Sequence, residues 1–265
     1  CKGAAVIVKQ TINPEPVLAN LSATACSGLT INLTLNTNGT SVAAANYNVT
    51  AVTVAAGLVS GATNAVVPAT GVSAGYLSND KYTNSSNTDK TVTYKIVPVS
   101  ATGCLGDEVS VVMTIAPQPV LAATLNKTAC SGVAGGITLN TNGTSVAAST
   151  YNITSIVVAG GLTAAAGNAV VANGVTAAYL SGDKFTNTGS TSKTVRYTVV
   201  PVSAAGCAGA PLDVVLTVNP EPVMDPSLAT ATICSRDKLN ITLGTNGVSV
   251  AALNYDITLV SKDAS

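Results

Sequence analysis

Apolar and polar residues alternate along the segments TINLTLN, YNVTAVTVA, TVTYKIVPV and EVSVVMTI, which are rich in β-branched side chains. A period of two residues is typical of a strand with one buried face, and turn-forming residues bound each run. No 3.6-residue pattern competes with these runs, so the chain is predicted to be all-β. Val, Ile, Leu and Tyr are expected to face inward, and Thr, Ser and Asn outward. The four predicted strands are residues 30–36, 47–55, 91–99 and 108–115.

A long repeat organises these strands. Its proline motifs TINPEPV, TIAPQPV and TVNPEPV begin at Thr11, Thr114 and Thr217, so that each begins 103 residues after the one before. A period of this length exceeds that of a solenoid unit and matches an independently folding domain. About seven strands in roughly 100 residues, with turn signals between them, indicate an immunoglobulin-like β-sandwich. The predicted fold is therefore a set of tandem sandwich domains, arranged as beads in a rod.

The proline motifs also set the expected domain boundaries. Two complete repeats are predicted at residues 13–115 and 116–218. Residues 1–12 align with the end of the first repeat and are expected to form the last strand of a preceding truncated repeat. Residues 219–265 are expected to form the first strands of a further truncated repeat. The chain is therefore interpreted as a segment of a longer array.

Composition narrows the possible functions. The chain has no His, charged residues make up only 9%, and Lys plus Arg equals Asp plus Glu at 12 each. Acid-base and metal chemistry at neutral pH relies on His or on clustered carboxylates, so we expect no enzyme, no catalytic residue and no cofactor. Without a basic block nucleic acid is an unfavoured partner, and no segment is apolar enough to predict membrane insertion or a signal peptide.

The one place where adjacent acidic residues could suggest a calcium site is the pair Asp107 and Glu108. The second repeat has Gly209 and Ala210 at the equivalent place, and Ca²⁺ needs several clustered oxygens. No metal site is therefore predicted. The pairs Asp80–Lys81 and Asp183–Lys184 are predicted to be solvated turns, in preference to sugar-gripping residues or a local ion pair.

The six cysteines fall at regular places in the repeats. Their placement in a charge-poor, Thr-rich chain indicates disulfides and an oxidising exterior, whereas zinc is disfavoured because there is no CxxC motif and no His. One set precedes the second strand and the other lies in the last hairpin: Cys26, Cys130 and Cys234, then Cys1, Cys104 and Cys207. Cys1 and Cys234 are expected to pair outside this segment.

Two pairings of the other four cysteines remain open. Spacing favours Cys26 with Cys104 and Cys130 with Cys207, one disulfide in each repeat. In an immunoglobulin-like sandwich, however, those positions lie at opposite ends of strands about 23 Å long, and a disulfide tolerates roughly 7 Å between Cα atoms. The exit end of one repeat meets the entry end of the next, so we favour Cys26 with Cys207 as a covalent tie between repeats.

The segment NTNGTSVAA occurs at residues 36–44 and again at 140–148, and GTNGVSVAA follows at 244–252. Its Asn-Gly pair is a strong turn signal because both residues tolerate positive φ. We interpret it as a structural turn that marks recent duplication of a domain, in preference to an exposed loop that touches a ligand. The pairs are Asn38–Gly39, Asn142–Gly143 and Asn246–Gly247.

These motifs together resemble a known family. An NPxP linker, then TACSG or TICS, a Tyr-bearing strand and TVxYxxxPxSxxGCxG are similar to the PKD-like and Ig-like repeats of giant Bacteroidetes surface adhesins, such as SprB-type gliding adhesins exported by the type IX system. The resemblance covers the whole chain and implies a secreted, cell-surface location. The family usually has Trp where Tyr47, Tyr151 and Tyr255 stand, a departure that affects packing.

Two functions follow from this reading. The favoured one is a structural stalk of a large secreted adhesin or filament that serves surface attachment or gliding motility. The alternative is an array of polysaccharide-binding modules that gains avidity by repetition. Few aromatic residues are available to bind sugars, since only 3% of the residues are aromatic. Expected partners are neighbouring repeats, with surface polysaccharide or other copies of the chain as further options.

Overall fold

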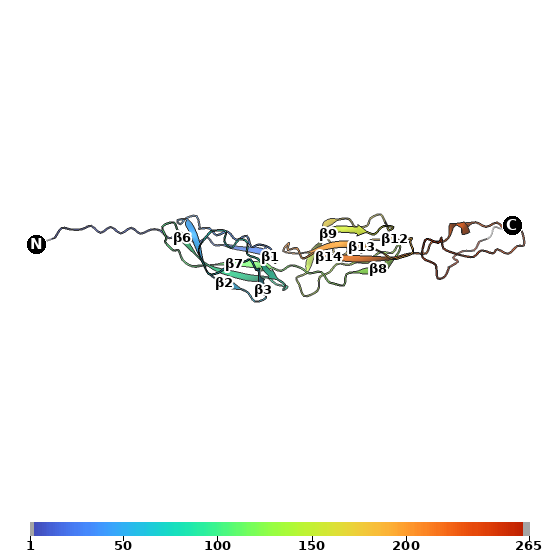
Figure 1. Cartoon of the computed structure of the whole chain (residues 1–265), viewed down its shortest axis with the longest axis horizontal. Helices are drawn as coiled ribbons and strands as arrows, with labels where there is room; N and C mark the ends of the chain where they lie inside the picture. Colours follow the sequence, from blue (N-terminus) through green and yellow to red (C-terminus); the bar gives the residue numbers. More distant parts are fainter. Residues whose placement is uncertain (1–2, 262–265) are drawn as a thin grey trace. The chain divides into compact units, whose positions relative to one another are not determined.

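The computed structural model describes residues 3–261, and its regular structure is β apart from one short 3-10 helix. The chain divides into two compact units (Figure 1). The first unit contains the residues up to Pro119 together with two short segments from later in the chain, Thr144–Val146 and Ala205–Ala208. The second unit contains the rest. Both units are β-sandwiches, so the predicted fold class is confirmed.

The first unit contains a five-stranded sheet in the order β1-β7-β6-β2-β4 and a two-stranded sheet of β3 and β5. Strand β1 runs parallel to β7, and the other pairs are antiparallel. The strands are β1 (Ser22–Cys26), β2 (Ala44–Val54), β3 (Leu58–Ser60), β4 (Ala69–Val72), β5 (Tyr82–Asn84), β6 (Lys90–Ser100) and β7 (Val109–Ala116).

The second unit repeats this topology. Its larger sheet has the order β8-β14-β13-β9-β11, with β8 parallel to β14, and its small sheet pairs β10 with β12. The strands are β8 (Lys127–Cys130), β9 (Ala148–Val158), β10 (Thr163–Ala164), β11 (Ala172–Val175), β12 (Phe185–Thr186), β13 (Lys193–Ser203) and β14 (Leu212–Asn219).

Each unit has its own apolar core. In β6 the side chains of Val92, Tyr94 and Ile96 alternate with exposed or half-buried neighbours and are fully buried. Burying an aliphatic side chain of this size contributes roughly 1.5–3 kcal/mol, so the period-two pattern supplies much of the stability. The equivalent positions of β13 are Val195, Tyr197 and Val199, which are also fully buried.

The segment of residues 30–36, which was predicted to be a strand, is not one. Ile31, Leu33 and Leu35 are buried, so the alternation was interpreted correctly. However, the amides of Ile31 and Leu35 donate to the carbonyl oxygens of Asp80 and Ala74, which lie outside any strand. The segment therefore packs its apolar face into the sandwich without forming a ladder.

The two predicted end segments also differ from expectation. No strand forms in the described residues 3–12 or 220–261. The latter contain a 3-10 helix, η1 (Pro226–Ala229), and one isolated bridge between Met224 and Thr245. A strand needs a neighbour for its backbone hydrogen bonds. The sequence has no counterpart of β6 next to residues 3–12, which align with β7, and none of β6 or β7 next to residues 220–261.

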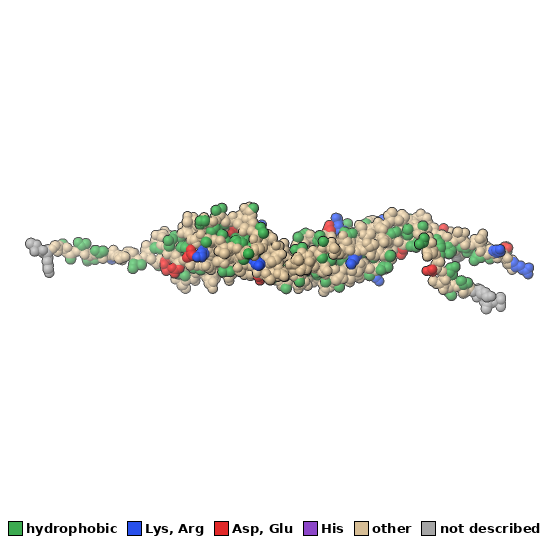
Figure 2. All heavy atoms as spheres, turned by 90° about the horizontal axis from the view of Figure 1, so that it is seen from below, with side chains coloured by type: hydrophobic (Ala, Val, Ile, Leu, Met, Phe, Trp, Pro, Cys, Tyr) green, Lys and Arg blue, Asp and Glu red, His purple; other side chains and the backbone are tan. Residues whose placement is uncertain are grey.

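The surface carries few charges. Figure 2 shows Lys, Arg, Asp and Glu side chains as scattered spots among uncharged atoms on the face that it draws. Lys95 of β6 forms a surface ion pair with Glu108, which lies just before β7. Arg196 of β13 forms another with Asp213 of β14. Among the described residues, no helix is long and apolar enough to cross a membrane.

Candidate functional site: the Cys26–Cys207 disulfide and the buried polar clusters

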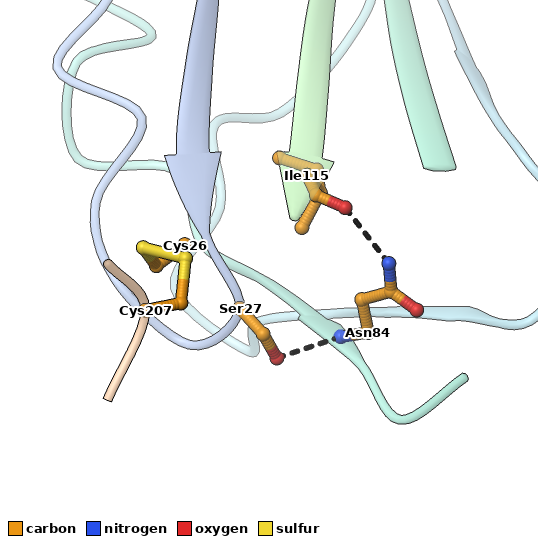
Figure 3. The surroundings of a disulfide bond; sticks show 5 residues. All are labelled: Cys26, Ser27, Asn84, Ile115 and Cys207. Carbon is orange, nitrogen blue, oxygen red and sulfur yellow. Dashed lines mark hydrogen bonds between the residues drawn. A yellow bond between two sulfur atoms is a disulfide. The ribbon is translucent and has the colours of Figure 1, made fainter. Parts of the chain in front are cut away.

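A disulfide joins Cys26 to Cys207, with 5.4 Å between their Cα atoms (Figure 3). Cys26 is the last residue of β1 and lies opposite Ala116, the last residue of β7. Cys207 lies in the loop between β13 and β14, and it is buried to 1% exposure. The part of that loop around Cys207, Ala205–Ala208, belongs to the first unit. In terms of the sequence repeat, the bond therefore ties one repeat to the next.

The turn after β1 fixes the position of Cys26. The amide of Ser27 donates to the carbonyl oxygen of Ala116 at 2.8 Å, and the amide of Gly28 donates to that of Tyr82 at 2.9 Å. Gly28 has φ = 77°, a left-handed conformation that favours glycine. The TACSG motif thus places a glycine where the chain must turn immediately after the cysteine.

A buried asparagine connects this turn to the end of the sheet (Figure 3). The amide of Asn84 donates to Ser27 Oγ at 2.8 Å, and Asn84 Nδ2 donates to the carbonyl oxygen of Ile115 at 2.8 Å. Asn84 is fully buried, so each of its polar atoms needs a partner, and the side chain also bonds to Ser86 and Thr88. The hydrogen bonds of Asn84 therefore connect the turn after Cys26 to the end of β7.

The second unit builds the same end. Asn187 is fully buried, its amide donates to Ser131 Oγ at 2.8 Å, and its Nδ2 donates to the carbonyl oxygen of Val218 at 2.9 Å. Cys130 ends β8 just as Cys26 ends β1, but it is exposed and carries a free thiol.

The structure contains the pairing between repeats, and neither pairing within a repeat. Cys104 is half-buried and unbonded, although its sulfur lies 3.6 Å from Thr102 Oγ1. Cys234 is exposed and also unbonded, and the pairing expected for it stays a prediction. Cys1, with the pairing expected for it, lies outside the described residues.

The predicted solvated turn at Asp80 and Asp183 is wrong for both carboxyl groups. Each is 2% exposed. Asp80 Oδ1 accepts from the amide of Ala65 at 2.7 Å, and Asp80 Oδ2 accepts from the hydroxyl of Tyr94 at 2.7 Å. Asp183 is bonded in the same way by Ala169 and Tyr197, at 2.8 and 2.7 Å. Burial of each carboxyl group is tolerated because both of its oxygens accept a hydrogen bond.

The lysines next to these aspartates do lie at the surface. Lys81 and Lys184 are exposed, and their backbone is held by the side-chain amides of Asn64 and Asn168. Sequence reasoning missed the buried aspartates because a charged residue in a loop is usually solvated. An available signal was that Asp and Tyr stand 14 residues apart in both repeats.

Burial also acts on the tyrosines of these clusters. Desolvation, followed by the hydrogen bonds to Tyr82 and Asp80, raises the pKa of Tyr94 far above its ordinary value. Desolvation and the bond to Asp183 raise the pKa of Tyr197 in the same direction. Both phenols therefore stay protonated and act as hydrogen-bond donors throughout the neutral range.

The Asn-Gly pairs form turns that are hydrogen-bonded to the segment that follows the proline linker. Asn38 Oδ1 accepts from the amides of Thr40 and Ser41 at 3.0 and 2.9 Å, and Ser41 Oγ accepts from the amide of Val17 at 2.9 Å. Gly39 has φ = 79°, as the turn requires. The backbone amide of Asn38 donates to the carbonyl oxygen of Val17, and those of Asn142 and Asn246 donate in the same way to Val120 and Val223. The glycines of these two turns, Gly143 and Gly247, have φ of 79° and 76°.

No grouping of three or more acidic, His or Cys side chains that could hold a metal occurs among the described residues. Glu108, half of the acidic pair considered for calcium, is instead bonded by Lys95 Nζ and Thr50 Oγ1. The hydrogen bonds from Lys95 and Thr50 lower the pKa of Glu108. The notable chemistry of this chain is therefore the disulfide and its support.

Comparison with known proteins gives a family and two distant structures. A family model described as "PKD-like domain" matches residues 23–119 and 127–222. No curated protein sequence matches the chain. Human CDH23 EC21-23 shares 10% identity at a TM-score of 0.24, over 88% of this chain and 80% of that one. The sialic acid binding region of a Streptococcus sanguinis SK1 adhesin, bound to 3'sLn, shares 13% identity at a TM-score of 0.20, over 81% of each chain.

Proposed function

The chain belongs to the PKD-like domain family, and on that premise we propose that its repeats form the structural stalk of a secreted cell-surface adhesin or filament. In this role the repeats hold a binding region away from the cell and serve attachment or gliding motility. Neighbouring repeats are the direct partners of each domain. Members of one fold host many functions, so the proposal rests on particular residues as well as on the family.

The observation that carries the proposal is the disulfide between Cys26 and Cys207. A bond across 181 residues of sequence restrains two domains with respect to each other, which a stalk needs and two independent binding modules do not. Disulfides persist in oxidising surroundings, which supports a location outside the cytosol. The proline-rich segments between repeats add stiffness because Pro fixes φ.

The first test is a non-reducing peptide map of the full chain, which we expect to contain a peptide that links Cys26 to Cys207. Removing the bond by Cys26→Ser should lower the free energy of unfolding by about 2–4 kcal/mol, measured by denaturant titration. Cys104→Ser is the matched control and should leave it unchanged, because Cys104 is unbonded. A peptide that links Cys26 to Cys104 would contradict the stapled stalk.

Location and binding need separate measurements. Antibodies against the repeats should label intact cells of the source organism and lose their target after external protease treatment. Labelling only after cell lysis would argue against a surface stalk. The full chain should also show no retention on an array of polysaccharides. Strong retention would favour the alternative, an array of sugar-binding modules.

A further inference from the structure

The three copies of the Asn-Gly turn have different surroundings. Each ends in Ser-Val: Ser41–Val42, Ser145–Val146 and Ser249–Val250. In the third copy the amide of Val250 donates to the carbonyl oxygen of Gly189, in the loop after β12 of the second repeat, at 3.2 Å. The turn therefore does more than reverse the chain, because it also binds the end of the preceding repeat.

The serine of the turn is buried in the third and second copies and more exposed in the first. Ser249 and Ser145 are 7% and 9% exposed, and the segment that contains Ser145, Thr144–Val146, belongs to the first unit although it comes from the second repeat. In the first copy Ser41 is only half-buried and Val42 is 37% exposed. One turn of the three is thus open.

The hairpin cysteines differ in the same way. Cys207 is 1% exposed and bonded, whereas Cys104 is half-buried and free. The two hairpins have the same backbone, since Gly106 donates its amide to the carbonyl oxygen of Pro98 at 2.9 Å and Gly209 donates to that of Pro201 at 2.8 Å. The hairpin of Cys104 therefore already has the form of the one that is bonded.

We propose that the Asn38–Val42 turn and the Cys104 hairpin of the first repeat together form a docking surface for another PKD-like repeat. The occupant is the exit end of a repeat of this type, with a loop like that around Gly189 and a cysteine at the position of Cys26. This inference rests on the proposed stalk and names the partner of one of its ends. It gives the repeated nonapeptide a role as a connector between domains.

The Cys104 hairpin packs against the proline linker at Pro16. A Cβ on Gly106 would overlap the carbonyl oxygen of Pro16, so the CLG segment can lie against the linker only with glycine at that place. Val17, next to Pro16, is bonded to Ser41 of the turn at 2.9 Å. The linker thus joins the turn to the hairpin of Cys104, and both can meet the same partner.

The closing step is a thiol oxidation. The Cys104 thiol and the partner thiol together lose two protons and two electrons to a small-molecule disulfide such as oxidised glutathione, which becomes two thiols as the new S–S bond forms. Docking raises the rate of this step because it holds the two sulfur atoms together. The turn and the cysteine therefore have distinct contributions that can be measured separately.

The test uses a lengthened chain, in which residues 1–115 are followed by residues 13–265, so that a repeat precedes the original first repeat. The added copy has Cys104→Ser, which leaves one Cys104, and Ala23→Ser as a mass label at an exposed position. After oxidation with glutathione, a non-reducing peptide map should link the labelled Cys26 to Cys104. Alkylation of Cys104 should fall at least tenfold relative to the original chain.

Two variants separate docking from chance oxidation. Cys26→Ser in the added copy should restore full alkylation of Cys104. Val42→Asp in the original first repeat should slow formation of the new bond severalfold, while the original chain with Val42→Asp keeps its unfolding midpoint, because Val42 is at the surface. If Cys104 stays reactive while Cys26–Cys207 forms, the docking surface is refuted alone. If the Cys26–Cys207 disulfide does not form either, both the docking surface and the disulfide-tied stalk are refuted.

Discussion

The two repeats build the same buried cluster with different residues. In the first unit Tyr82 and Tyr94 share a hydrogen bond of 2.7 Å, and Tyr94 in turn donates to Asp80. Because the single hydroxyl proton of Tyr94 goes to Asp80, Tyr82 is the donor to Tyr94. In the second unit Phe185 stands at the place of Tyr82 and has no hydroxyl, while Tyr197 still donates to Asp183.

The difference separates what the fold requires from what it tolerates. The carboxyl group, its phenol donor and the backbone amide recur in both units, so we infer that they hold the loop before β5 or β12 to the sheet. The hydroxyl of Tyr82 is an addition, for which Phe185 substitutes at similar burial. The same fold thus exists with three linked side chains, Tyr82, Tyr94 and Asp80, and with the pair of Tyr197 and Asp183.

The largest effect should come from removing the carboxyl groups. Asp183→Ala leaves the Tyr197 hydroxyl and the Ala169 amide without their partner, and we expect a loss of about 4 kcal/mol in the stability of the second repeat. Asp80→Ala should cost the first repeat about as much, because it leaves the Ala65 amide and one of the two hydroxyl protons of Tyr82 and Tyr94 without an acceptor. Hydrogen exchange of β13 and β6 peptides, measured by mass spectrometry on the intact chain, reports each repeat separately.

The unchanged repeat is the internal control in each variant. A clearly smaller loss for Asp80→Ala would show that the Tyr82 hydroxyl compensates for the missing carboxyl group. The carboxyl group would then be less important to the first repeat than to the second.

The buried asparagines should distinguish the two repeats. Asn84 Oδ1 accepts from both the amide and the hydroxyl of Ser86, whereas Asn187 Oδ1 accepts from the amide of Gly189, which has no side chain to add a second bond. Asn84→Ala removes four side-chain hydrogen bonds and Asn187→Ala removes three. At about 1 kcal/mol for each hydrogen bond, Asn84→Ala should therefore cost about 4 kcal/mol, roughly 1 kcal/mol more than Asn187→Ala. The same hydrogen-exchange experiment measures both losses of stability. A larger loss for Asn187→Ala would show that the second hydrogen bond from Ser86 to Asn84 adds no stability.

Alkaline pH should distinguish the repeats more weakly. Burial raises the pKa of Tyr82 and Tyr94 in the first repeat and of Tyr197 in the second. Their stabilising effect is complete below the ordinary tyrosine pKa of 10.0 and falls above it, because only the unfolded chain then releases the proton. Each such tyrosine contributes a slope of about 1.4 kcal/mol per pH unit.

Denaturant titrations of the parent chain and of Tyr82→Phe between neutral pH and pH values above 10.0 test this. Above the ordinary tyrosine pKa, the free energy of unfolding of Tyr82→Phe should fall less steeply with pH than that of the parent chain. The difference should be the slope that one tyrosine contributes, about 1.4 kcal/mol per pH unit. Identical slopes would mean that Tyr82 ionises in the folded chain.

The smallest effect is expected from exchanging the ring that differs. Phe185→Tyr adds a hydroxyl that can donate to Tyr197, and Tyr82→Phe removes one from Tyr94. We expect changes of about 0.5–1 kcal/mol, stabilising for the former and destabilising for the latter, since a neutral hydrogen bond has about this net value. Thermal unfolding measures both, and a destabilised Phe185→Tyr would show that the second cluster has no room for the oxygen.

The sequence predicted the architecture because the architecture depends on pattern. Alternation identified the buried faces of β2, β6 and β7, and the repeat of the prolines predicted tandem sandwiches. Alternation also identified the apolar side of residues 30–36, but it did not show that their neighbours are turn residues that cannot form a ladder. Whether an extended segment becomes a strand depends on its partners, which lie far away in sequence.

The buried aspartates show a second limit. Asp80 is flanked by Asn79 and Lys81, and its neighbours along the chain suggest solvent. Its burial is decided by Tyr94, which reaches it from the next long strand, and by Ala65 from an earlier loop. The residues alone likewise allow two cysteine pairings, because the outcome depends on which ends of the strands lie together.

The disulfide also determines which residues would carry a pulling force. If the chain is stretched from its ends, tension passes from Cys26 directly to Cys207 through the sulfur atoms, and the 181 residues of separation lie in a closed loop that bears no load. That loop holds back about 600 Å of contour length, at roughly 3.4 Å per residue. Only after reduction could the central strands of the two sandwiches be pulled apart, so the redox state of the surroundings would set the extensibility of the molecule.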